Sequence, residues 1–237
     1  MFGKTLNAGQ ICLAPDYVMV HSSKKDEFIE STKEAVKEYF PTMKDNDDYS
    51  SVINENHFNR LNGLLDDARE KGATIEPINP ANEDFNQQEF YKIPPTLVLN
   101  TTDDMRIMKE EIFGPLMPVR EFESLEEPIS FINNYDKPLG LYYFGKDKKE
   151  ESEIMDKTTS GGVTINNVMG HIQQGDLPFG GVGASGTGRY EGYDGFLNFS
   201  NPRAVYKDIS TKLDKLYSAI RPPYQGDIEK VLQKLLK

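Results

Sequence analysis

The chain has 237 residues, a length that allows one large domain or two small ones, each with a buried core. Its 38 acidic and 27 basic residues give a net charge of −11, which argues against a nucleic-acid partner, because binding to phosphates needs a positive surface. No run of about eighteen apolar residues predicts a membrane span, and residues 1–10 lack the apolar core of a signal peptide.

Hydrophobic periodicity predicts strands that alternate with helices along the chain. In chain order we expect a strand at 13–21, helices at 24–40 and 55–71, strands at 73–78, 96–99 and 116–122, a helix at 125–134, a strand at 139–145, a helix at 148–159 and a strand at 162–166. Alternating strands and helices imply right-handed crossovers. The predicted fold class is therefore α/β, a mostly parallel sheet covered by helices on both faces.

Cys12 is the only cysteine, and it ends the segment Asn-Ala-Gly-Gln-Ile-Cys at residues 7–12. A lone cysteine forms neither an internal disulfide nor a cysteine-rich metal site, which leaves core packing or nucleophilic chemistry. Gly9 and Gln10 favour nucleophilic chemistry, because they predict a tight turn whose backbone N–H groups stabilise a thiolate or an oxyanion. A single thiol without an export signal also makes the reducing cytoplasm the expected compartment.

The glycine-rich segment near the C-terminus matches a dinucleotide-binding motif in its letters only. Gly181, Gly183 and Gly186 spell GxGxxG, a pattern that indicates a pyrophosphate site where it follows a strand and opens a helix. Pro178 argues against a central strand before the motif, and no amphipathic helix follows within the next turn. We therefore interpret the segment as an irregular loop packed near a site.

Asn166 and Asn167 follow a predicted strand, at the carboxyl end where parallel sheets gather their ligand sites. We place both near a substrate pocket, with an ordinary asparagine turn as the alternative. His21, His57 and His171 show no metal-ligand spacing, so no metal site is predicted. A cysteine–histidine hydrolase pair stays open, because its partners can lie far apart in sequence.

Three segments, taken together and in this order, resemble motifs of the C-terminal catalytic half of the aldehyde dehydrogenase superfamily. Residues 7–12 resemble its nucleophile motif, Glu-Glu-Ile-Phe-Gly-Pro at 110–115 its cofactor-contacting motif, and Leu-Pro-Phe-Gly-Gly at 177–181 its late glycine loop. The resemblance extends over nearly the whole chain. Three further segments resemble the branch that holds class 3 and coniferyl aldehyde dehydrogenases: residues 12–17, 137–142 and 221–224.

The resemblance implies a role for each motif. Cys12 would attack the aldehyde carbon to form a thiohemiacetal, hydride would leave for NAD or NADP, and water would hydrolyse the thioester to the acid. Glu111 would bind the nicotinamide ribose hydroxyls, and Phe113 would pack beside the nicotinamide. Alone, these two residues indicate a solvated charge and a core aromatic, so their roles rest on the motif. Phe179 joins the two asparagines as a candidate pocket residue, and coniferyl aldehyde is the first choice of substrate.

The family's complete chain also holds an N-terminal Rossmann-like domain, which binds most of the cofactor and supplies the general base. Only eleven residues precede Cys12, so we expect the N-terminal cofactor-binding domain to be absent and this fragment to be inactive alone. Residues 1–195 would form the nucleophile-bearing catalytic domain. Two alternatives remain: an acylating or acyl-phosphate-reducing relative, and a non-catalytic assembly module with an idle cysteine. The phenylalanine motifs favour the oxidising branch over the first, and retention of Cys12 with the cofactor motif weighs against the second.

Residues 196–237 would form an oligomerisation strand segment and a C-terminal tail. Phe196–Ser200 and Arg203–Tyr206 are predicted to be extended, and the resemblance implies that this region reaches a partner subunit's sheet in a homodimer. Residues 227–237 predict a short amphipathic docking helix with too few apolar residues for a membrane anchor.

Overall fold

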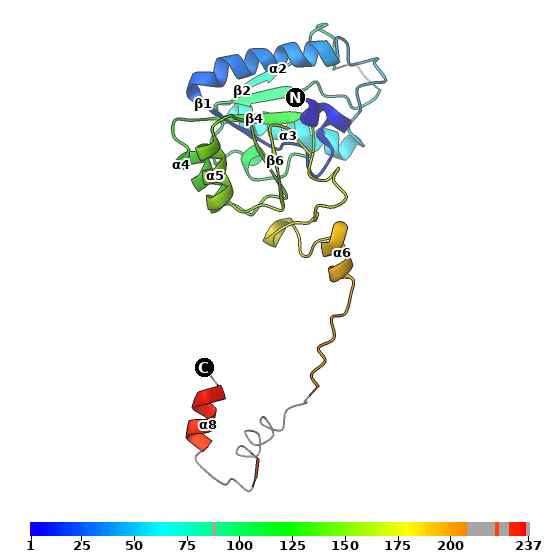
Figure 1. Cartoon of the computed structure of the whole chain (residues 1–237). Helices are drawn as coiled ribbons and strands as arrows, with labels where there is room; N and C mark the ends of the chain where they lie inside the picture. Colours follow the sequence, from blue (N-terminus) through cyan, green and yellow to red (C-terminus); the bar gives the residue numbers. More distant parts are fainter. Residues whose placement is uncertain (87–88, 208–220, 223–227, 236–237) are drawn as a thin grey trace. The chain divides into compact units, whose positions relative to one another are not determined.

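A computed structural model describes residues 1–86, 89–207, 221–222 and 228–235 (Figure 1). Residues 1–199 form one compact unit and residues 200–237 a second. The helices are α1 (Phe2–Thr5), α2 (Lys25–Tyr39), α3 (Glu55–Glu70), α4 (Glu126–Asn134), α5 (Lys148–Lys157), α6 (Gly192–Asn198) and, in the second unit, α8 (Ile228–Leu235). The strands are β1 (Val18–His21), β2 (Thr74–Pro77), β3 (Thr96–Leu99), β4 (Leu116–Phe122), β5 (Gly140–Tyr143) and β6 (Gly162–Ile165).

The strands form two sheets, which are parallel except at one edge. The larger sheet has the order β1-β4-β3-β2, in which β1 and β3 both pair with β4 in parallel and β2 pairs with β3 antiparallel. The smaller sheet is the parallel pair of β5 and β6. The predicted α/β class with a mostly parallel sheet is therefore confirmed.

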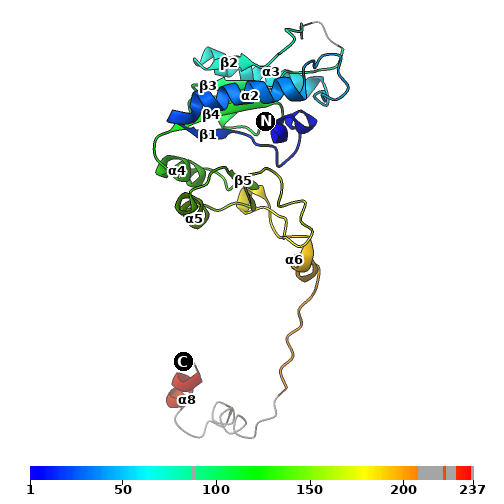
Figure 2. The same cartoon turned by 45° about the horizontal axis from the view of Figure 1, so that its top comes forward.

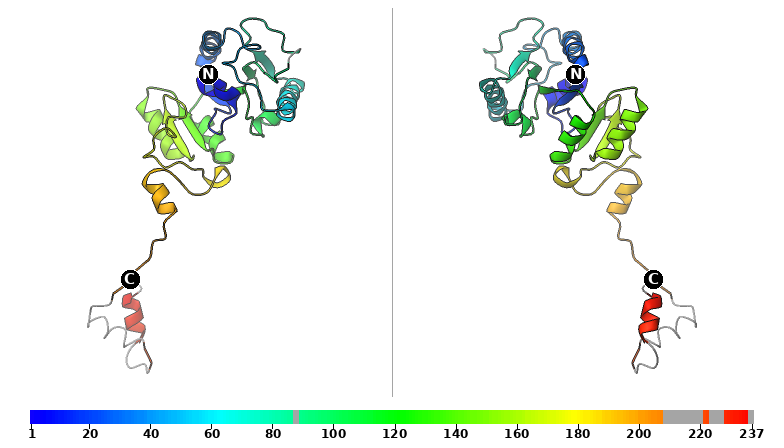
Figure 3. Two further views of the ribbon diagram at one scale, coloured as in Figure 1. Left: turned by 90° about the vertical axis from the view of Figure 1, so that its right-hand side faces the viewer. Right: turned by 90° about the vertical axis from the view of Figure 1, so that its left-hand side faces the viewer.

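Helices α2 and α3 cover opposite faces of the larger sheet (Figure 2 and Figure 3). Successive residues of β3 show why, because side chains along a strand point to alternate faces. Leu97 and Leu99 pack into the cluster that contains Ile29 of α2, whereas Val98 packs into the cluster that contains Leu64 of α3. The prediction that helices cover both faces is confirmed.

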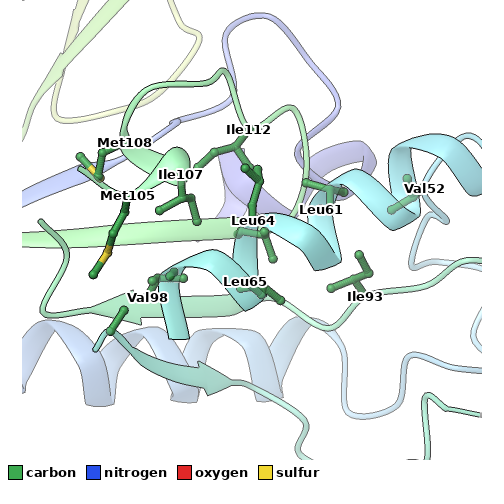
Figure 4. Packing of buried hydrophobic residues seen from close by; sticks show 13 residues of the cluster. Val52, Leu61, Leu64, Leu65, Ile93, Val98, Met105, Ile107, Met108 and Ile112 are labelled. Carbon is green, nitrogen blue, oxygen red and sulfur yellow. The ribbon is translucent and has the colours of Figure 1, made fainter. Parts of the chain in front are cut away.

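The hydrophobic cluster that contains Leu64 packs α3 against the larger sheet (Figure 4). Asn54 caps the helix by accepting a hydrogen bond from the His57 N–H (3.0 Å). Leu61, Leu64, Leu65 and Ala68 lie on the inward face at helical spacing and are buried. From this face Leu61, fully buried, reaches the loop before β4.

Two predicted elements differ from the structure. The strand expected from residue 13 begins only at Val18, because residues 11–14 form the turn that carries Cys12. The prediction of an extended segment at Phe196–Ser200 is wrong, since Phe196, Leu197 and Asn198 belong to α6. A strand needs a neighbouring strand for its backbone groups, whereas this helix pairs its own, as in the bond from the Phe199 N–H to the Gly195 carbonyl (3.1 Å).

In the second unit, Arg203–Tyr206 lies outside any helix or strand. The predicted terminal helix is present as α8 over Ile228–Leu235. Residues 227, 236 and 237 of that prediction, and residues 223 and 224 of the branch motif, lie outside the described residues. Within the described ranges, no helix combines the length and apolar character that crossing a membrane requires.

Candidate active site

Cys12 lies exposed on a hydrogen-bonded turn. The chain enters this turn through three consecutive residues with left-handed backbone, Asn7 (φ 49°), Ala8 (φ 51°) and Gly9 (φ 74°). The turn itself is closed by the Ala14 N–H, which donates to the Ile11 carbonyl (2.8 Å). An exposed thiol on a defined turn favours the nucleophile interpretation over core packing.

Gln10 fastens the start of this turn to the segment before α3. Its amide nitrogen donates to the carbonyls of Asn7 (3.0 Å) and Ser51 (2.9 Å). Its amide oxygen accepts from the Ile53 N–H (2.9 Å). Both ends of the amide are used, so the backbone that leads to Cys12 is held on two sides.

The segment Glu111–Phe113 is held by two charged side chains. The Arg60 guanidinium of α3 donates to the carbonyls of Glu111 (3.1 Å) and Ile112 (2.5 Å). The Asp16 carboxylate accepts from the Ile112 N–H (3.0 Å). Ile112 is fully buried while Glu111 and Phe113 are exposed, and the left-handed φ of Phe113 (46°) turns the chain at this point. These bonds therefore present a carboxylate and an aromatic ring outward.

The Cys12 segment and the Glu111–Phe113 segment touch through their backbones. A Cβ at Gly9 would lie 2.3 Å from the Gly114 carbonyl oxygen, and a Cβ at Gly114 would lie 2.5 Å from the Leu61 side chain. The atoms that a Cβ at Gly9 would meet are backbone atoms, so only glycine allows so close an approach at that position. The structure thus brings the predicted nucleophile and the two predicted cofactor residues onto adjoining segments.

A buried lysine and a partly buried aspartate interact electrostatically near these segments. Lys4 of α1 is 1% exposed, and burial lowers its pKa to about 8, against the opposing effect of the Asp16 charge. Burial raises the pKa of Asp16, and the nearby Lys4 charge and the Ile112 N–H partly offset that rise. The two charges belong to the segments on either side of the Cys12 turn.

The predicted pocket asparagines bond to nearby backbone. The Asn166 amide donates to the Gly145 carbonyl (3.0 Å) and accepts from the Gly145 N–H (2.9 Å), which clips together the ends of β5 and β6. The Asn167 amide oxygen accepts from the Val168 N–H (2.8 Å). The bonds of Asn166 join residues 21 positions apart, whereas the bond of Asn167 is local, as in the asparagine turn raised as the alternative by the sequence.

Phe179 lies against the ring of His171, with 6.3 Å between ring centroids. Its backbone pairs with Tyr190 through two 2.8 Å hydrogen bonds, which close the glycine-rich loop at its base. Within that loop a Cβ at Gly181 would lie 2.1 Å from the Ser185 carbonyl, so the loop packs on itself. α6 begins only at Gly192, and the interpretation of the segment as an irregular loop is confirmed.

The sequence motifs missed several side chains that shape this site. Arg60 acts on the backbone of residues 111–112, which leaves no periodic signal. Asp16 lies in the branch motif at residues 12–17, but that motif did not indicate its bond to the Ile112 N–H. Lys4 is a buried lysine within a segment too short to show a pattern. Tyr142 is noted only as part of the family motif at residues 137–142. Its hydroxyl donates to the Leu13 carbonyl (2.8 Å), next to Cys12 in the chain.

A cavity of about 690 Å³ lies elsewhere, at β4 and α4, with Arg120, Phe131 and Tyr135 among its lining residues. Cys12 does not line it. Among the residues that the structure describes, no three histidine, cysteine, aspartate or glutamate side chains gather to hold a metal ion. The site is therefore an exposed surface built around the thiol turn.

This α/β domain carries its one cysteine on a turn held by hydrogen bonds. An exposed carboxylate and an exposed aromatic ring lie on the adjoining segment. These are the features of a thiol-dependent enzyme domain. Comparison with known proteins gives the family. The family described as "Aldehyde dehydrogenase family" matches residues 1–205, and the chain belongs to it.

Individual relatives agree with this assignment. The chain is 49% identical over 237 residues to a protein of Caulobacter vibrioides named a probable coniferyl aldehyde dehydrogenase, covering all of this chain and 49% of that one. It is 40% identical over 205 residues to a dimeric NADP-preferring aldehyde dehydrogenase of Rattus norvegicus, covering 86% of this chain and 43% of that one. It resembles the substrate-bound structure of Staphylococcus aureus AldH with a TM-score of 0.75 and 34% identity, covering 93% of this chain and 49% of that one. The chain spans about half the length of the curated relatives that it matches.

Proposed function

We propose that this chain is the nucleophile-bearing half of an NAD(P)-dependent aldehyde dehydrogenase that oxidises aldehydes to carboxylic acids. One observation carries the proposal: the exposed Cys12 turn adjoins the segment that presents Glu111 and Phe113 outward. The branch motifs and the name of the Caulobacter relative support coniferyl aldehyde as the substrate.

In this proposal the Cys12 thiolate attacks the aldehyde carbon, and a C–S bond forms as the carbonyl oxygen becomes an oxyanion. The backbone N–H of Cys12 stabilises that oxyanion. When bound, the nicotinamide accepts the hydride that leaves the thiohemiacetal carbon. The thioester left on Cys12 is then hydrolysed by water, and the thiolate departs as the acid forms.

Glu111 and Phe113 fit a cofactor contact, because an exposed carboxylate accepts hydrogen bonds from ribose hydroxyls and an exposed ring packs against a planar base. Both side chains are outward while the residue between them is fully buried. The rat relative's name includes NADP, and we propose NAD or NADP for this chain.

The other expectations are kept as proposals. Phe179 contributes a wall of the aldehyde pocket, and Asn166 and Asn167 shape the loop beside it. Residues 1–195 act as the catalytic domain and residues 196–237 in assembly, as a homodimer in the complete enzyme. A nucleophilic thiol survives in a reducing compartment, so we propose the cytoplasm.

The first test compares this chain alone with the same chain joined to an N-terminal half from a relative. We expect the purified 237-residue chain alone to show no aldehyde-dependent reduction of NAD(P). Fusion of the chain to the N-terminal half of the Caulobacter relative should give reduction with coniferyl aldehyde, followed at 340 nm. The same fusion with Cys12→Ser should give none. Turnover by the chain alone, or equal turnover with Cys12→Ser, would contradict the proposal.

A second test needs only the chain. Because the turn around Cys12 is preformed, iodoacetamide should label the native thiol faster than the thiol of the urea-denatured chain. Equal labelling rates would mean that the thiol environment depends on a companion half.

A further inference from the structure

Tyr142 of β5 joins the smaller sheet to the turn that carries the thiol. Its hydroxyl donates to the Leu13 carbonyl (2.8 Å), one residue after Cys12. The two residues are 129 positions apart in the chain, so nothing but the fold brings them together. The Leu13 side chain is 3% exposed, and its Cδ2 would lie 3.0 Å from a Cβ at Gly140 on the same strand as Tyr142.

The peptide that Tyr142 binds is the one that closes the Cys12 turn. The carbonyl of Leu13 and the N–H of Ala14 belong to a single planar peptide. The N–H donates to the Ile11 carbonyl (2.8 Å) and the carbonyl accepts from Tyr142. That peptide is therefore held at both ends, with Cys12 between Ile11 and Leu13.

The Tyr142 ring is itself held by its neighbours. The His171 ring packs beside the Tyr142 ring with 6.4 Å between their centroids. His171 is fixed in turn by Thr164, whose hydroxyl lies 2.8 Å from the ring Nδ1 and accepts from the His171 N–H (3.2 Å). Burial raises the pKa of Tyr142 to about 12, so the hydroxyl keeps its proton as a donor.

We propose that Tyr142 is a positioning residue for the Cys12 nucleophile: by holding the Leu13–Ala14 peptide it sets the geometry of the thiol and of the N–H groups around it. The inference rests on the proposed role of Cys12. The reason is geometric, because a nucleophile displaced by about 1 Å loses about a hundredfold in rate. His171 contributes indirectly because it packs beside the Tyr142 ring, and Thr164 contributes because it fixes His171.

Tyr143 provides a matched control. It is the next residue on β5, is also half-buried, and its hydroxyl donates to the Glu150 carboxylate (3.0 Å) on α5, away from the turn. Tyr142→Phe and Tyr143→Phe each remove one hydroxyl from neighbouring positions of one strand. A general loss of stability would affect both variants alike.

Two measurements on the 237-residue chain test the proposal. Hydrogen exchange at the Ala14 amide, followed by NMR, should become about three- to tenfold faster in Tyr142→Phe, the change expected from one net hydrogen bond. Iodoacetamide labelling of native Cys12 should slow by a similar factor toward the denatured rate. Tyr143→Phe should match the wild-type chain in both measurements, and a thermal melt confirms that both variants are folded.

Unchanged Ala14 exchange in Tyr142→Phe would overturn the anchoring, and an unchanged labelling rate would overturn its effect on the thiol. An equal effect of Tyr143→Phe would show a general loss of stability and also overturn the proposal. If wild-type Cys12 is labelled no faster in the native than in the denatured chain, the preformed nucleophile of the proposed function fails, and Ala14 exchange still decides whether Tyr142 holds the turn.

Discussion

Gly9 is where the thiol turn and the cofactor-contacting segment come closest, and Gly9→Ala is the most informative single change there. The added Cβ would lie 2.3 Å from the Gly114 carbonyl oxygen and 2.7 Å from its carbonyl carbon. Both are backbone atoms, so no side-chain rotation relieves the overlap. Gly72 has a comparable left-handed φ (93°, against 74° at Gly9) but no atom within 4 Å of its added Cβ. Gly72→Ala is therefore the matched control.

Both substitutions place alanine in the left-handed region, and only Gly9→Ala adds a backbone overlap. Alanine in the left-handed region costs about 1–2 kcal/mol, partly offset by about 0.4–1 kcal/mol from a stiffer unfolded chain. The backbone overlap at Gly9 adds about 1–3 kcal/mol, the range for forced shifts in a packed site. Gly9→Ala should therefore lower the free energy of unfolding by about 1–3 kcal/mol more than Gly72→Ala.

Urea unfolding of both variants measures this difference, provided that the slope of unfolding free energy against urea stays that of the wild type. Iodoacetamide labelling of Cys12 should also slow in Gly9→Ala, because separation of the two segments loosens the turn. Equal losses of stability in the two variants would refute the reasoning that the close backbone contact decides the cost.

Three further substitutions test the supports of the site. Leu61→Ala removes a fully buried side chain and should lower the free energy of unfolding by about 2–5 kcal/mol in urea titrations; a loss below about 1 kcal/mol would contradict the packing. Burial lowers the Lys4 pKa to about 8, so between about pH 8 and 10 the unfolded chain binds more protons, and wild-type stability should rise with pH by up to about 3 kcal/mol. Lys4→Met should lack that rise, and a flat wild-type curve would refute it. Arg60→Gln should speed hydrogen exchange in residues 110–116, whereas Arg69→Gln, which removes an exposed ion pair, should leave exchange there unchanged.

The alternation of strands and helices was visible in the sequence because it depends on local periodicity. The strands β3 and β4 have the predicted bounds, Thr96–Leu99 and Leu116–Phe122, because their apolar runs are bounded by turn residues. The larger error, at Phe196–Asn198, arose where a short apolar stretch is compatible with both strand and helix.

The candidate site also contains residues that the sequence predicted and residues that it did not. Cys12, Glu111 and Phe113 stand out in the sequence, because the motif around each is contiguous. The roles of Arg60 and Asp16 do not stand out, because these side chains act on the backbone of residues distant in sequence, 51 positions away for Arg60 and 96 for Asp16.

The sequence by itself determined the fold class, the family resemblance and the lone thiol in its turn-forming segment. Only the tertiary structure decided that the thiol is exposed, that Gly9 touches Gly114, and that Tyr142 holds the Leu13 carbonyl. The physical reason is that periodicity and motifs report neighbours along the chain. Exposure and hydrogen bonds between distant segments exist only once strands and helices have packed.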